Sequence, residues 1–374
     1  MKDNMSATHS GVQVEIQGFA FGGAAFGKLS DGKICFVRGA VPGEIVEVEI
    51  FSDKKRFAEG RIIKICRESD QRITPVCPLA IQPGNFCNAC PGCSYQQVSY
   101  ETEIFWKHKE FTDFILRNNL ADSDMIQPPF PAPQRYGWRN KLKLACEVGD
   151  GQMQMGYRGE DNQTLLPVHH CALARKSINQ EMEKIWQKGI PANADKVHFR
   201  WTLPNGCKTW YGQIDQTAPW LQEQLGELGS FLVPPASFFQ VNLAVAEELL
   251  KRTAKILNDL QINFLADLYC GTGIFSLAAA KLNPDLNCIG IELDSQAVAA
   301  ARKNAANHNL TKRCRYYAGD SAKILSGVLH QRDLRQGAFL VDPPRTGLHA
   351  DAVRQILRFK PGYILYVSCA PDTL

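Results

Sequence analysis

The first part of the chain alternates between apolar and polar residues in short runs that are separated by glycines. Alternation with a period of two, closed by tight turns, predicts β-strands with one buried face. Several such strands in succession predict a small barrel, because closure leaves no strand edge unpaired. The predicted strands are residues 12–16, 34–37, 45–50 and 60–65.

The end of the chain has a different pattern, in which short apolar runs alternate with stretches of helical spacing. Strict alternation of strand and helix predicts a parallel sheet with helices packed on it. We therefore predict a Rossmann-like α/β domain here. Its predicted strands are residues 264–268, 288–291, 315–318, 339–341 and 363–368, and its predicted helices are residues 243–257, 275–280, 295–308 and 351–359.

Between these patterns lie a helical stretch at residues 99–118, a proline run at residues 128–133 and further β runs. Because proline interrupts regular structure, the proline run indicates a boundary and favours a separate, β-rich central part. The predicted domains are residues 1–68, 69–230 and 231–374.

Length and composition narrow the class of protein. The chain has 374 residues, room for two or three domains, and a 45% hydrophobic content that is ordinary for a globular protein. It has no apolar run near the ~20 residues of a membrane helix and no signal-peptide pattern at its start. Thirteen cysteines without a secretion signal indicate a reducing compartment, so we predict a cytoplasmic protein. A net charge of +4 permits nucleic acid as a partner without requiring it.

The turn after residues 264–268 carries the clearest ligand signal. Gly271 and Gly273 lie between this strand and the next helix, an arrangement that brings backbone close to a ligand at a helix start. Glu292 ends the next strand, where its carboxylate can accept both hydroxyls of a ribose. The pair predicts an adenosine-bearing ligand. Ser276 replaces the third glycine of a dinucleotide fingerprint, which disfavours an NAD-dependent enzyme.

Other polar residues also follow predicted strands, at the edge where open α/β sheets bind ligands. Asp342 precedes two prolines that stiffen its turn and remove backbone donors, which suits a carboxylate facing a planar base. Cys369 ends the last apolar strand beside this edge and is a candidate nucleophile. Gln240, Glu292, Asp320, Asp342 and Cys369 are predicted to converge on one crevice.

Four cysteines fall in a proline- and glycine-rich stretch, a setting unlike core packing. Thiolates at this spacing can share a metal ion or an iron–sulfur cluster, and a more distant cysteine, Cys171, can complete the set. Zinc bound by cysteine and histidine is the competing interpretation. The four are Cys77, Cys87, Cys90 and Cys93.

Basic and aromatic residues are interleaved at two places that suit RNA. Residues 54–57, Lys-Lys-Arg-Phe, would form the tip of a barrel hairpin. Residues 135–144, and later residues 155–158, interleave basic and aromatic side chains along predicted strands, as an RNA-facing sheet would. A solvated hairpin end and an exposed strand face are the simpler explanations.

The motifs and their order resemble the RNA uracil-5-methyltransferases over almost the whole chain. Residues 36–44 resemble the TRAM domain, an OB-like RNA-binding barrel, and the cysteine cluster follows it. The remaining motifs are Tyr136-Gly137-Trp138-Arg139-Asn140-Lys141, Ser237-Phe238-Phe239-Gln240-Val241-Asn242, Asp342-Pro343-Pro344-Arg345 and Val367-Ser368-Cys369.

This resemblance implies a class I methyltransferase domain that uses S-adenosyl-L-methionine to methylate uridine at C5. RNA is the implied partner, 23S rRNA favoured and tRNA the alternative, with no membrane association and a monomeric state. Cys369 matches the nucleophile of the family. Gln240, Tyr269, Gly271, Gly273, Glu292, Asp320 and Asp342 match residues around cofactor and target base, and Cys77, Cys90, Cys93 and Cys171 match the ligands of a [4Fe–4S] cluster.

Three departures from the family pattern stand out. Twelve residues separate Cys77 from Cys90, a long gap in which Cys87 offers a rival ligand, and Ile274 stands where many members have a polar residue. Nothing near Leu374 matches the glutamate that takes the C5 proton in the family, so we expect a chain that ends before it. Without that base, an RNA-binding protein that does not turn over is the rival hypothesis.

Overall fold

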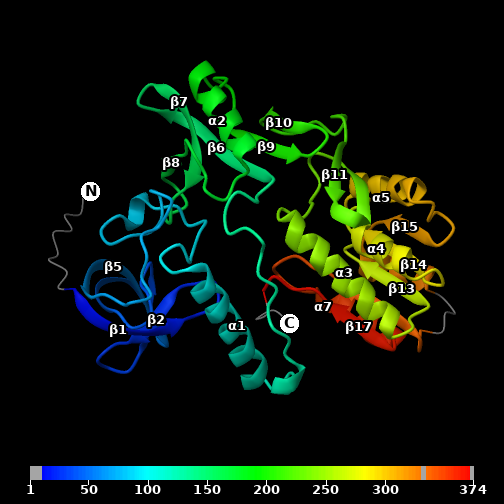
Figure 1. The fold of residues 1–374 in the computed structure, drawn as a ribbon, viewed down its shortest axis with the longest axis horizontal. Helices are drawn as coiled ribbons and strands as arrows, with labels where there is room; N and C mark the ends of the chain where they lie inside the picture. Colours follow the sequence, from blue (N-terminus) through cyan, green and yellow to red (C-terminus); the bar gives the residue numbers. More distant parts are fainter. Residues whose placement is uncertain (1–10, 330–333, 371–374) are drawn as a thin grey trace. The chain divides into compact units, whose positions relative to one another are not determined.

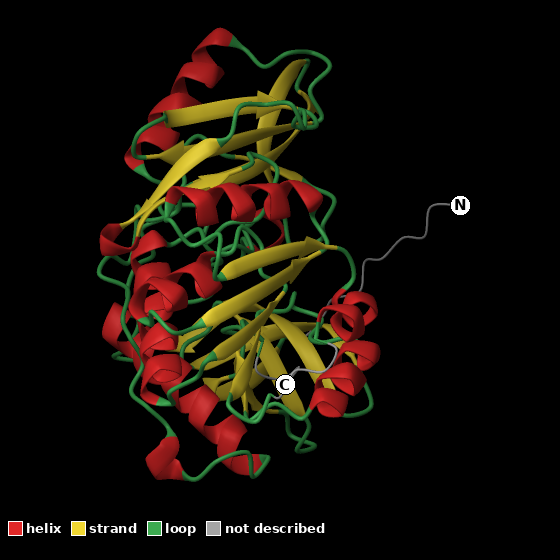
Figure 2. Cartoon of the chain, turned by 90° about the vertical axis from the view of Figure 1, so that its right-hand side faces the viewer, coloured by secondary structure: helices red, strands yellow, loops and turns green. Residues whose placement is uncertain are grey.

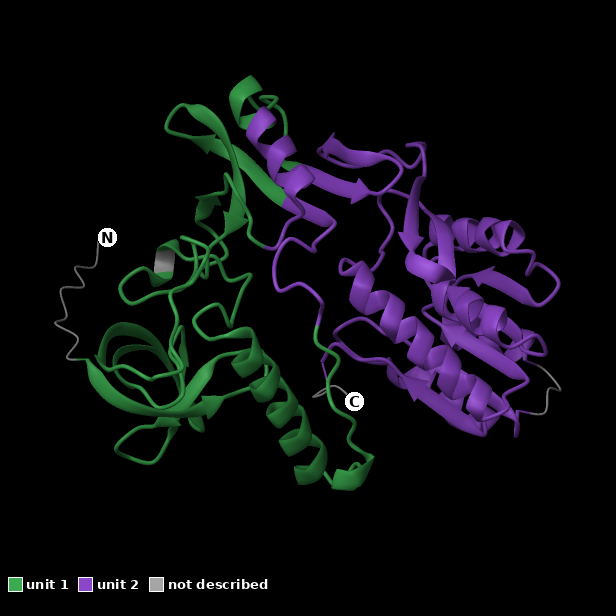
Figure 3. Ribbon diagram, viewed as in Figure 1, with its two compact units in different colours: residues 1–131, 144–172, 185–196 green, residues 132–143, 173–184, 197–374 purple. Residues whose placement is uncertain are grey.

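The structure is a computed structural model that describes residues 11–329 and 334–370, except for the side chain of Cys87. It divides into two compact units (Figure 3). Unit 1 comprises residues 1–131, 144–172 and 185–196, and unit 2 comprises residues 132–143, 173–184 and 197–374. Each unit therefore gathers segments that are far apart in the chain. The three predicted domains stay a prediction.

Unit 1 begins with a closed five-stranded barrel, as predicted (Figure 1). Its order is β1-β2-β3-β5-β4, and alternate residues of the strands enclose an apolar core that includes Val14 and Ile16. The predictions missed the four-residue strand β2, whose short run with a central glycine gives little β signal. The strands are β1 (Val12–Phe19), β2 (Ala25–Lys28), β3 (Ile34–Arg38), β4 (Ile45–Asp53) and β5 (Phe57–Arg67).

The rest of unit 1 combines one long helix with antiparallel strands. Helix α1 (Tyr100–Arg117) begins after Ser99, whose hydroxyl accepts a hydrogen bond from the backbone N–H of Thr102. Its Trp106 packs edge-on against Phe19, with ring centroids 5.7 Å apart, so the helix lies against the barrel. A 3₁₀ turn, η1 (Phe86–Asn88), precedes this helix. A second 3₁₀ turn and three strands follow it: η2 (Ser123–Met125), β6 (Lys141–Gly149), β7 (Gln152–Arg158) and β8 (Leu165–Pro167).

Unit 2 carries two antiparallel hairpins before its main sheet. Strand β9 (Lys196–Thr202) pairs with β10 (Gly206–Tyr211), and β11 (Leu221–Leu225) pairs with β12 (Gly229–Val233) across η3 (Gly226–Leu228). Helix α2 (Lys176–Lys188) and strand β6 each have residues in both units.

The main sheet of unit 2 has five parallel strands in the order β15-β14-β13-β16-β17. The order reverses beside β13, which creates the crevice where open α/β sheets bind ligands. The predicted Rossmann-like alternation is therefore confirmed. The strands are β13 (Phe264–Leu268), β14 (Asn287–Glu292), β15 (Cys314–Ala318), β16 (Gly337–Val341) and β17 (Tyr363–Tyr366).

Helices cover both faces of this sheet (Figures 1 and 2). Every residue of β13 is buried, and its side chains alternate between two apolar cores, with Leu265 in one and Phe264 and Leu268 in the other. The first core includes residues of α3 (Leu243–Asp259), α4 (Ile274–Leu282) and α5 (Ser295–Asn307). The second includes residues of α6 (Ser321–Val328) and α7 (Ala350–Phe359).

Two boundaries differ from the predictions and affect the site. Helix α6 was not predicted, because its eight residues make only about two turns and show little apolar periodicity. Asp320 caps this helix by accepting a hydrogen bond from the Ala322 N–H. Strand β17 ends at Tyr366, two residues before the predicted end, so Cys369 lies on the segment after the strand. Among residues 11–329 and 334–370, the helices are all too short or too polar to cross a membrane.

Candidate active site

The turn between β13 and α4 leaves space for a ligand. Tyr269, Gly271 and Gly273 all have positive φ angles, of 62°, 53° and 80°. A Cβ at Gly271 would meet nothing within 4 Å, so this part of the turn is open. A Cβ at Gly273 would lie 2.7 Å from the Tyr316 hydroxyl, so glycine is required there for packing. The strained Tyr269 backbone is typical of a functional turn, because such conformations are held only by the surrounding structure.

Glu292 is held beside this turn by two backbone donors. The Gly271 N–H donates to one carboxylate oxygen at 3.0 Å and the Asp294 N–H to the other at 2.9 Å. A carboxylate offers about four lone-pair sites, so two remain for further donors. The turn therefore fixes the orientation of the Glu292 carboxylate and leaves part of its acceptor capacity unused.

A cavity of about 740 Å³ opens at the ends of β13, β14 and β15. Its lining contains three of the predicted residues, Tyr269, Glu292 and Asp320. That volume lies within the usual range for small-molecule sites, ~300–1,000 Å³. Helix α7 supplies a wall of the cavity that the sequence did not suggest: His349 at its start, then Asp351, Ala352, Arg354 and Gln355.

The other predicted residues are not among those that line this cavity: Gly271, Gly273, Asp342, Cys369 and Gln240. Asp342 follows β16, and burial raises the pKa of its carboxyl to about 6. Cys369 is exposed, and the Ala370 N–H beside it donates to the Ser368 hydroxyl at 3.0 Å. The structure thus brings together part of the predicted set at one cavity, and leaves the nucleophile candidate accessible on a neighbouring segment.

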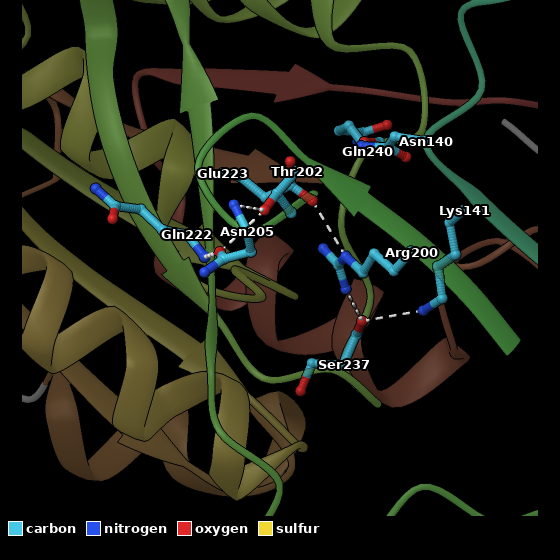
Figure 4. A network of polar contacts seen from close by, with 9 residues as sticks. All are labelled: Asn140, Lys141, Arg200, Thr202, Asn205, Gln222, Glu223, Ser237 and Gln240. Atoms are coloured by element: carbon cyan, nitrogen blue, oxygen red, sulfur yellow. Dashed lines mark hydrogen bonds and ion pairs between the residues drawn. The ribbon is translucent and has the colours of Figure 1, made fainter. Parts of the chain in front are cut away.

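The segment that carries Gln240 is anchored by a buried polar network (Figure 4). Lys141 and Arg200 both donate to the Ser237 carbonyl, at 3.3 and 3.4 Å. The Asn140 side chain donates to the Gln240 carbonyl at 3.4 Å. Such donors fix the backbone of the segment, so the position of Gln240 depends on strands far from it in the sequence.

A buried ion pair underlies this network. Arg200 is 2% exposed and donates to Glu223, which is fully buried, at 3.1 Å. Burial lowers the pKa of the neighbouring Lys141 to about 8 and raises the pKa of Glu223. Buried pairs of this kind contribute little net stability but cost much when one partner is removed. The pair therefore serves to hold one arrangement of the Ser237–Gln240 backbone.

Ser237 links this network to the cofactor side of the site. Its hydroxyl donates to the Asp294 carboxylate at 2.6 Å, and the Asp294 N–H is one of the two donors that orient Glu292. The sequence motif contained Ser237 but offered no sign of this bond, because the two residues belong to segments that meet only in the fold.

Asp267 is a second residue that sequence reasoning did not single out. It is 1% exposed within β13 and accepts a hydrogen bond from the Ser276 N–H at 3.2 Å, which ties the strand to α4 below the glycine turn. Burial raises the pKa of its carboxyl to about 7. An acidic residue inside an otherwise apolar strand was the signal that could have revealed it.

In unit 1, the four predicted cysteine ligands line one small apolar pocket. Cys77, Cys90 and Cys93 come from the loop after the barrel, and Cys171 comes from the segment after β8. Burial raises the pKa of the first three thiols, that of Cys93 to about 11. The pocket also contains Tyr157 and His170.

Within the described part of the chain, no three side chains of His, Cys, Asp or Glu are grouped closely enough to hold one metal ion. The iron–sulfur ligand set therefore stays a prediction. The side chain of Cys87, the predicted rival, lies outside the described part.

The predicted RNA-facing residues have mixed positions. Tyr157 faces the cysteine pocket, and Arg158 pairs with Glu147 at 2.7 Å on the neighbouring strand. Phe57, at the barrel tip, packs against Phe36 with ring centroids 5.7 Å apart, so it is not free to stack on a base. Arg175 lies over the Trp201 ring at 4.0 Å. The two predicted basic-aromatic surfaces are thus partly used by internal packing.

Comparison with known proteins gives two family matches. Residues 230–374 match the tRNA (uracil-5-)-methyltransferase family, and residues 10–63 match the TRAM domain. The first match contains the glycine turn, Glu292 and Cys369, and the second contains most of the barrel.

Relatives match over nearly the whole chain at low identity. A 23S rRNA (uracil(1939)-C(5))-methyltransferase of Aliivibrio fischeri is 25% identical, and the alignment covers 100% of this chain and 90% of the relative's length. An uncharacterised RNA methyltransferase of Clostridium tetani is 28% identical, over 92% of this chain and 85% of its own. The crystal structure of the tRNA (uracil-54, C5)-methyltransferase of Pyrococcus abyssi with S-adenosyl-L-homocysteine shares the fold, with a TM-score of 0.68, 20% identity, and coverage of 98% and 92%.

Proposed function

The chain is an RNA uracil-5-methyltransferase, with a TRAM domain ahead of a tRNA (uracil-5-)-methyltransferase family domain, and we propose that it methylates 23S rRNA through a covalent bond between Cys369 and the target uracil. The observation that carries the methyl-transfer part is the open glycine turn beside Glu292, at the mouth of a cavity large enough for S-adenosyl-L-methionine.

S-adenosyl-L-methionine would be held at the ends of β13, β14 and β15. Glu292 keeps two acceptor sites for the ribose hydroxyls, and the space at Gly271 lets the ligand approach the backbone. Tyr269 and Asp320 line the same cavity. When bound, the cofactor supplies an electrophilic methyl group on a sulfonium. Gln240 and Asp342 are the other two residues that we propose to contact the cofactor or the target base.

Uracil C5 is a weak nucleophile until a thiolate adds to C6. We assign this addition to Cys369, which is exposed on the segment after β17. The new C6–S bond moves an electron pair to C5, which then takes the methyl group as the methyl–sulfur bond of the sulfonium breaks. Loss of the C5 proton and of the C6–S bond restores the ring and the thiolate.

We assign recognition of the uracil edge to Asp342. With a pKa of about 6, its carboxyl is largely ionised at neutral pH and accepts the N3–H of uracil, whereas cytosine has no proton there to donate. The rigid Asp342-Pro343-Pro344 turn would hold that acceptor in place. The uridine must be extruded from its RNA context for Cys369 to reach C6.

We favour 23S rRNA because a 23S rRNA methyltransferase matches this chain end to end, and tRNA is the alternative because the structural relative acts on tRNA. The two are separated by methyl transfer from labelled S-adenosyl-L-methionine to each RNA, made as an unmodified transcript. Transfer to tRNA alone would overturn the rRNA assignment.

We also propose that Cys77, Cys90, Cys93 and Cys171 hold a [4Fe–4S] cluster. Support comes from the shared pocket, which brings all four thiols to one place in unit 1. The cluster would cross-link the loop after the barrel to the segment after β8.

The covalent step is tested with RNA that contains 5-fluorouridine at the target. Fluorine at C5 cannot leave as a proton does, so the Cys369 adduct should persist whichever base completes the normal reaction. We expect a protein–RNA band on a denaturing gel that Cys369→Ala abolishes. Cys66→Ala, a matched change at another exposed cysteine, should keep it. A persistent band from Cys369→Ala would assign the nucleophile elsewhere.

A further inference from the structure

A second cavity lies on unit 1, outside the methyltransferase site. It has a volume of about 120 Å³ and is enclosed by the β1–β2 loop of the barrel, the end of β3 and the loop that carries the Cys90–Cys93 pair. Phe21 and Arg38 are its aromatic and cationic lining residues. Neither the family matches nor the chemistry of methyl transfer assigns it a role.

Phe21 presents an exposed ring to this cavity. It is 54% exposed, whereas Phe19, two residues earlier, is buried and packs on Tyr95 and Trp106. Gly22 follows with a φ angle of +90°, and a Cβ there would meet nothing within 4 Å, so the space beside the ring is open. An accessible ring face with open space beside it is the arrangement on which RNA bases stack.

Arg38 supplies the charge. Its guanidinium contacts Glu160 at 2.5 Å, yet half of its side chain is exposed and a guanidinium has five N–H donors. Donors therefore remain for a phosphate or for a base carbonyl. The loop between the first two strands of an OB-like barrel is also a surface that such barrels use for oligonucleotides.

The size of the cavity limits what it can accept. At about 120 Å³ the cavity is smaller than one of ~150 Å³ that holds a benzene ring, so it excludes the fused rings of a purine and admits at most one six-membered ring that stays partly outside it. We propose that this cavity, which we call the Phe21 pocket, binds one pyrimidine nucleotide of single-stranded RNA outside the target uridine, with the base on Phe21 and Arg38 on its phosphate. The inference rests on the proposed function, because it deepens the recognition of the same RNA substrate.

The Phe21 pocket also shares a wall with the proposed cluster. Cys93 and Ser94 line the pocket, and Cys93 lines the cysteine pocket as well. A cluster on Cys93 would therefore keep this wall in place. This gives the proposed cluster a structural effect on RNA binding rather than a part in methyl transfer.

The test measures the affinity of the full chain for fluorescein-labelled single-stranded RNA by fluorescence anisotropy, with oligouridine and oligoadenine compared at one salt concentration. We expect tighter binding of oligouridine. Phe21→Leu keeps an apolar side chain but removes the ring face, and should weaken oligouridine binding by about 5- to 150-fold, the range expected for stacking one base. Phe51→Leu is the matched control, because Phe51 is 51% exposed on β4 of the same barrel but does not line the pocket.

Arg38→Gln tests the phosphate contact separately. It should reduce the slope of log affinity against log salt by ~0.7, the value for one phosphate contact on a single strand. Equal affinities of Phe21→Leu and Phe51→Leu, or no preference for oligouridine in the unaltered chain, would overturn the inference. Thermal unfolding of each variant should match the unaltered chain, because the substituted side chains are exposed.

The outcome is distinguishable from failure of the proposed function. A chain that methylates RNA but binds equally well with and without Phe21 disproves only the Phe21 pocket. A chain that shows no binding of S-adenosyl-L-methionine disproves the proposed function, whereas the anisotropy experiment measures RNA affinity without cofactor.

Discussion

The glycine turn of unit 2 and the cysteine pocket of unit 1 are built in opposite ways. The turn is a run of consecutive residues, so its shape follows from local backbone preferences and from one strand beside it. The cysteine pocket draws Cys77, Cys90 and Cys93 from the loop after the barrel and Cys171 from the segment after β8, so no single stretch of chain creates it. A local site can therefore persist when its partners change, whereas a site made of distant segments depends on each of them.

The largest expected effect concerns the distant-segment site. Cys90→Ser should abolish iron binding, because a [4Fe–4S] cluster normally needs all four thiolates, whereas protein purified without oxygen should otherwise carry about four irons per chain. Iron analysis and the brown absorption of the cluster measure this. The matched change Cys87→Ser should keep the iron. Loss of iron from Cys87→Ser and not from Cys90→Ser would reassign the ligands. One zinc ion per chain in place of iron would contradict the proposed cluster.

The local site should respond only in affinity. Glu292→Gln keeps the shape of the side chain but removes the charge that two backbone N–H groups orient, so S-adenosyl-L-methionine should bind about 5- to 150-fold more weakly, the cost of losing hydrogen bonds to a charged group. Calorimetric titration measures the dissociation constant. Glu248→Gln, at a half-buried position of α3 where the carboxylate pairs with Arg252, is the control and should bind normally. Equal affinities would remove Glu292 from the cofactor site.

The strand below the turn should show a pH effect. Because burial raises the pKa of Asp267 from 3.8 to about 7, the folded state holds its proton more tightly than the unfolded state. Its contribution to stability is therefore full below pH ~4 and is lost as the pH rises to about 7, at roughly 1.4 kcal/mol per pKa unit at most. Asp267→Asn should remove this loss, so its melting temperature should fall less than that of the unaltered chain between pH 5 and pH 8. Parallel curves for the two proteins would contradict this.

The smallest effect on cofactor affinity is expected at Ser237, where the Gln240 segment contacts the residues beside the glycine turn. Ser237→Ala removes the hydroxyl that donates to Asp294 and so loosens the link between the Gln240 segment and Glu292. We expect weaker cofactor binding by up to about tenfold, the range for one lost hydrogen bond. Ser230→Ala, which removes a hydroxyl bonded to Gln224 in the β11–β12 hairpin, is the control. Cofactor affinity that falls equally in both variants would show a general loosening rather than a specific link.

Local patterns were enough to predict the parallel sheet and the barrel. Strand β13 is buried on both faces and is apolar except for Asp267, and the barrel strands alternate because one face meets the core. The short elements β2 and α6 were not predicted, because a prediction from apolar periodicity needs more residues than these elements contain. The end of β17 was also misplaced, since pairing with β16 rather than residue type decides where a strand stops.

By itself, the sequence determined the residues that act through their immediate neighbours. Gly271 and Gly273 adopt positive φ angles because the turn requires them, and Glu292 follows its strand at a spacing that brings it back to that turn. These relations depend on chain direction and residue type, both of which are visible in one dimension.

Only the tertiary structure decided which distant side chains meet. It joined Ser237 to Asp294, buried Asp267 until the pKa of its carboxyl rose, and brought Cys171 to the pocket of Cys77, Cys90 and Cys93. It also placed Phe21 at an open cavity and Phe57, from the predicted RNA-binding tip, against Phe36. The physical reason is that burial and contact depend on how strands and helices pack, and packing depends on the sum of many weak apolar contacts that no local pattern records.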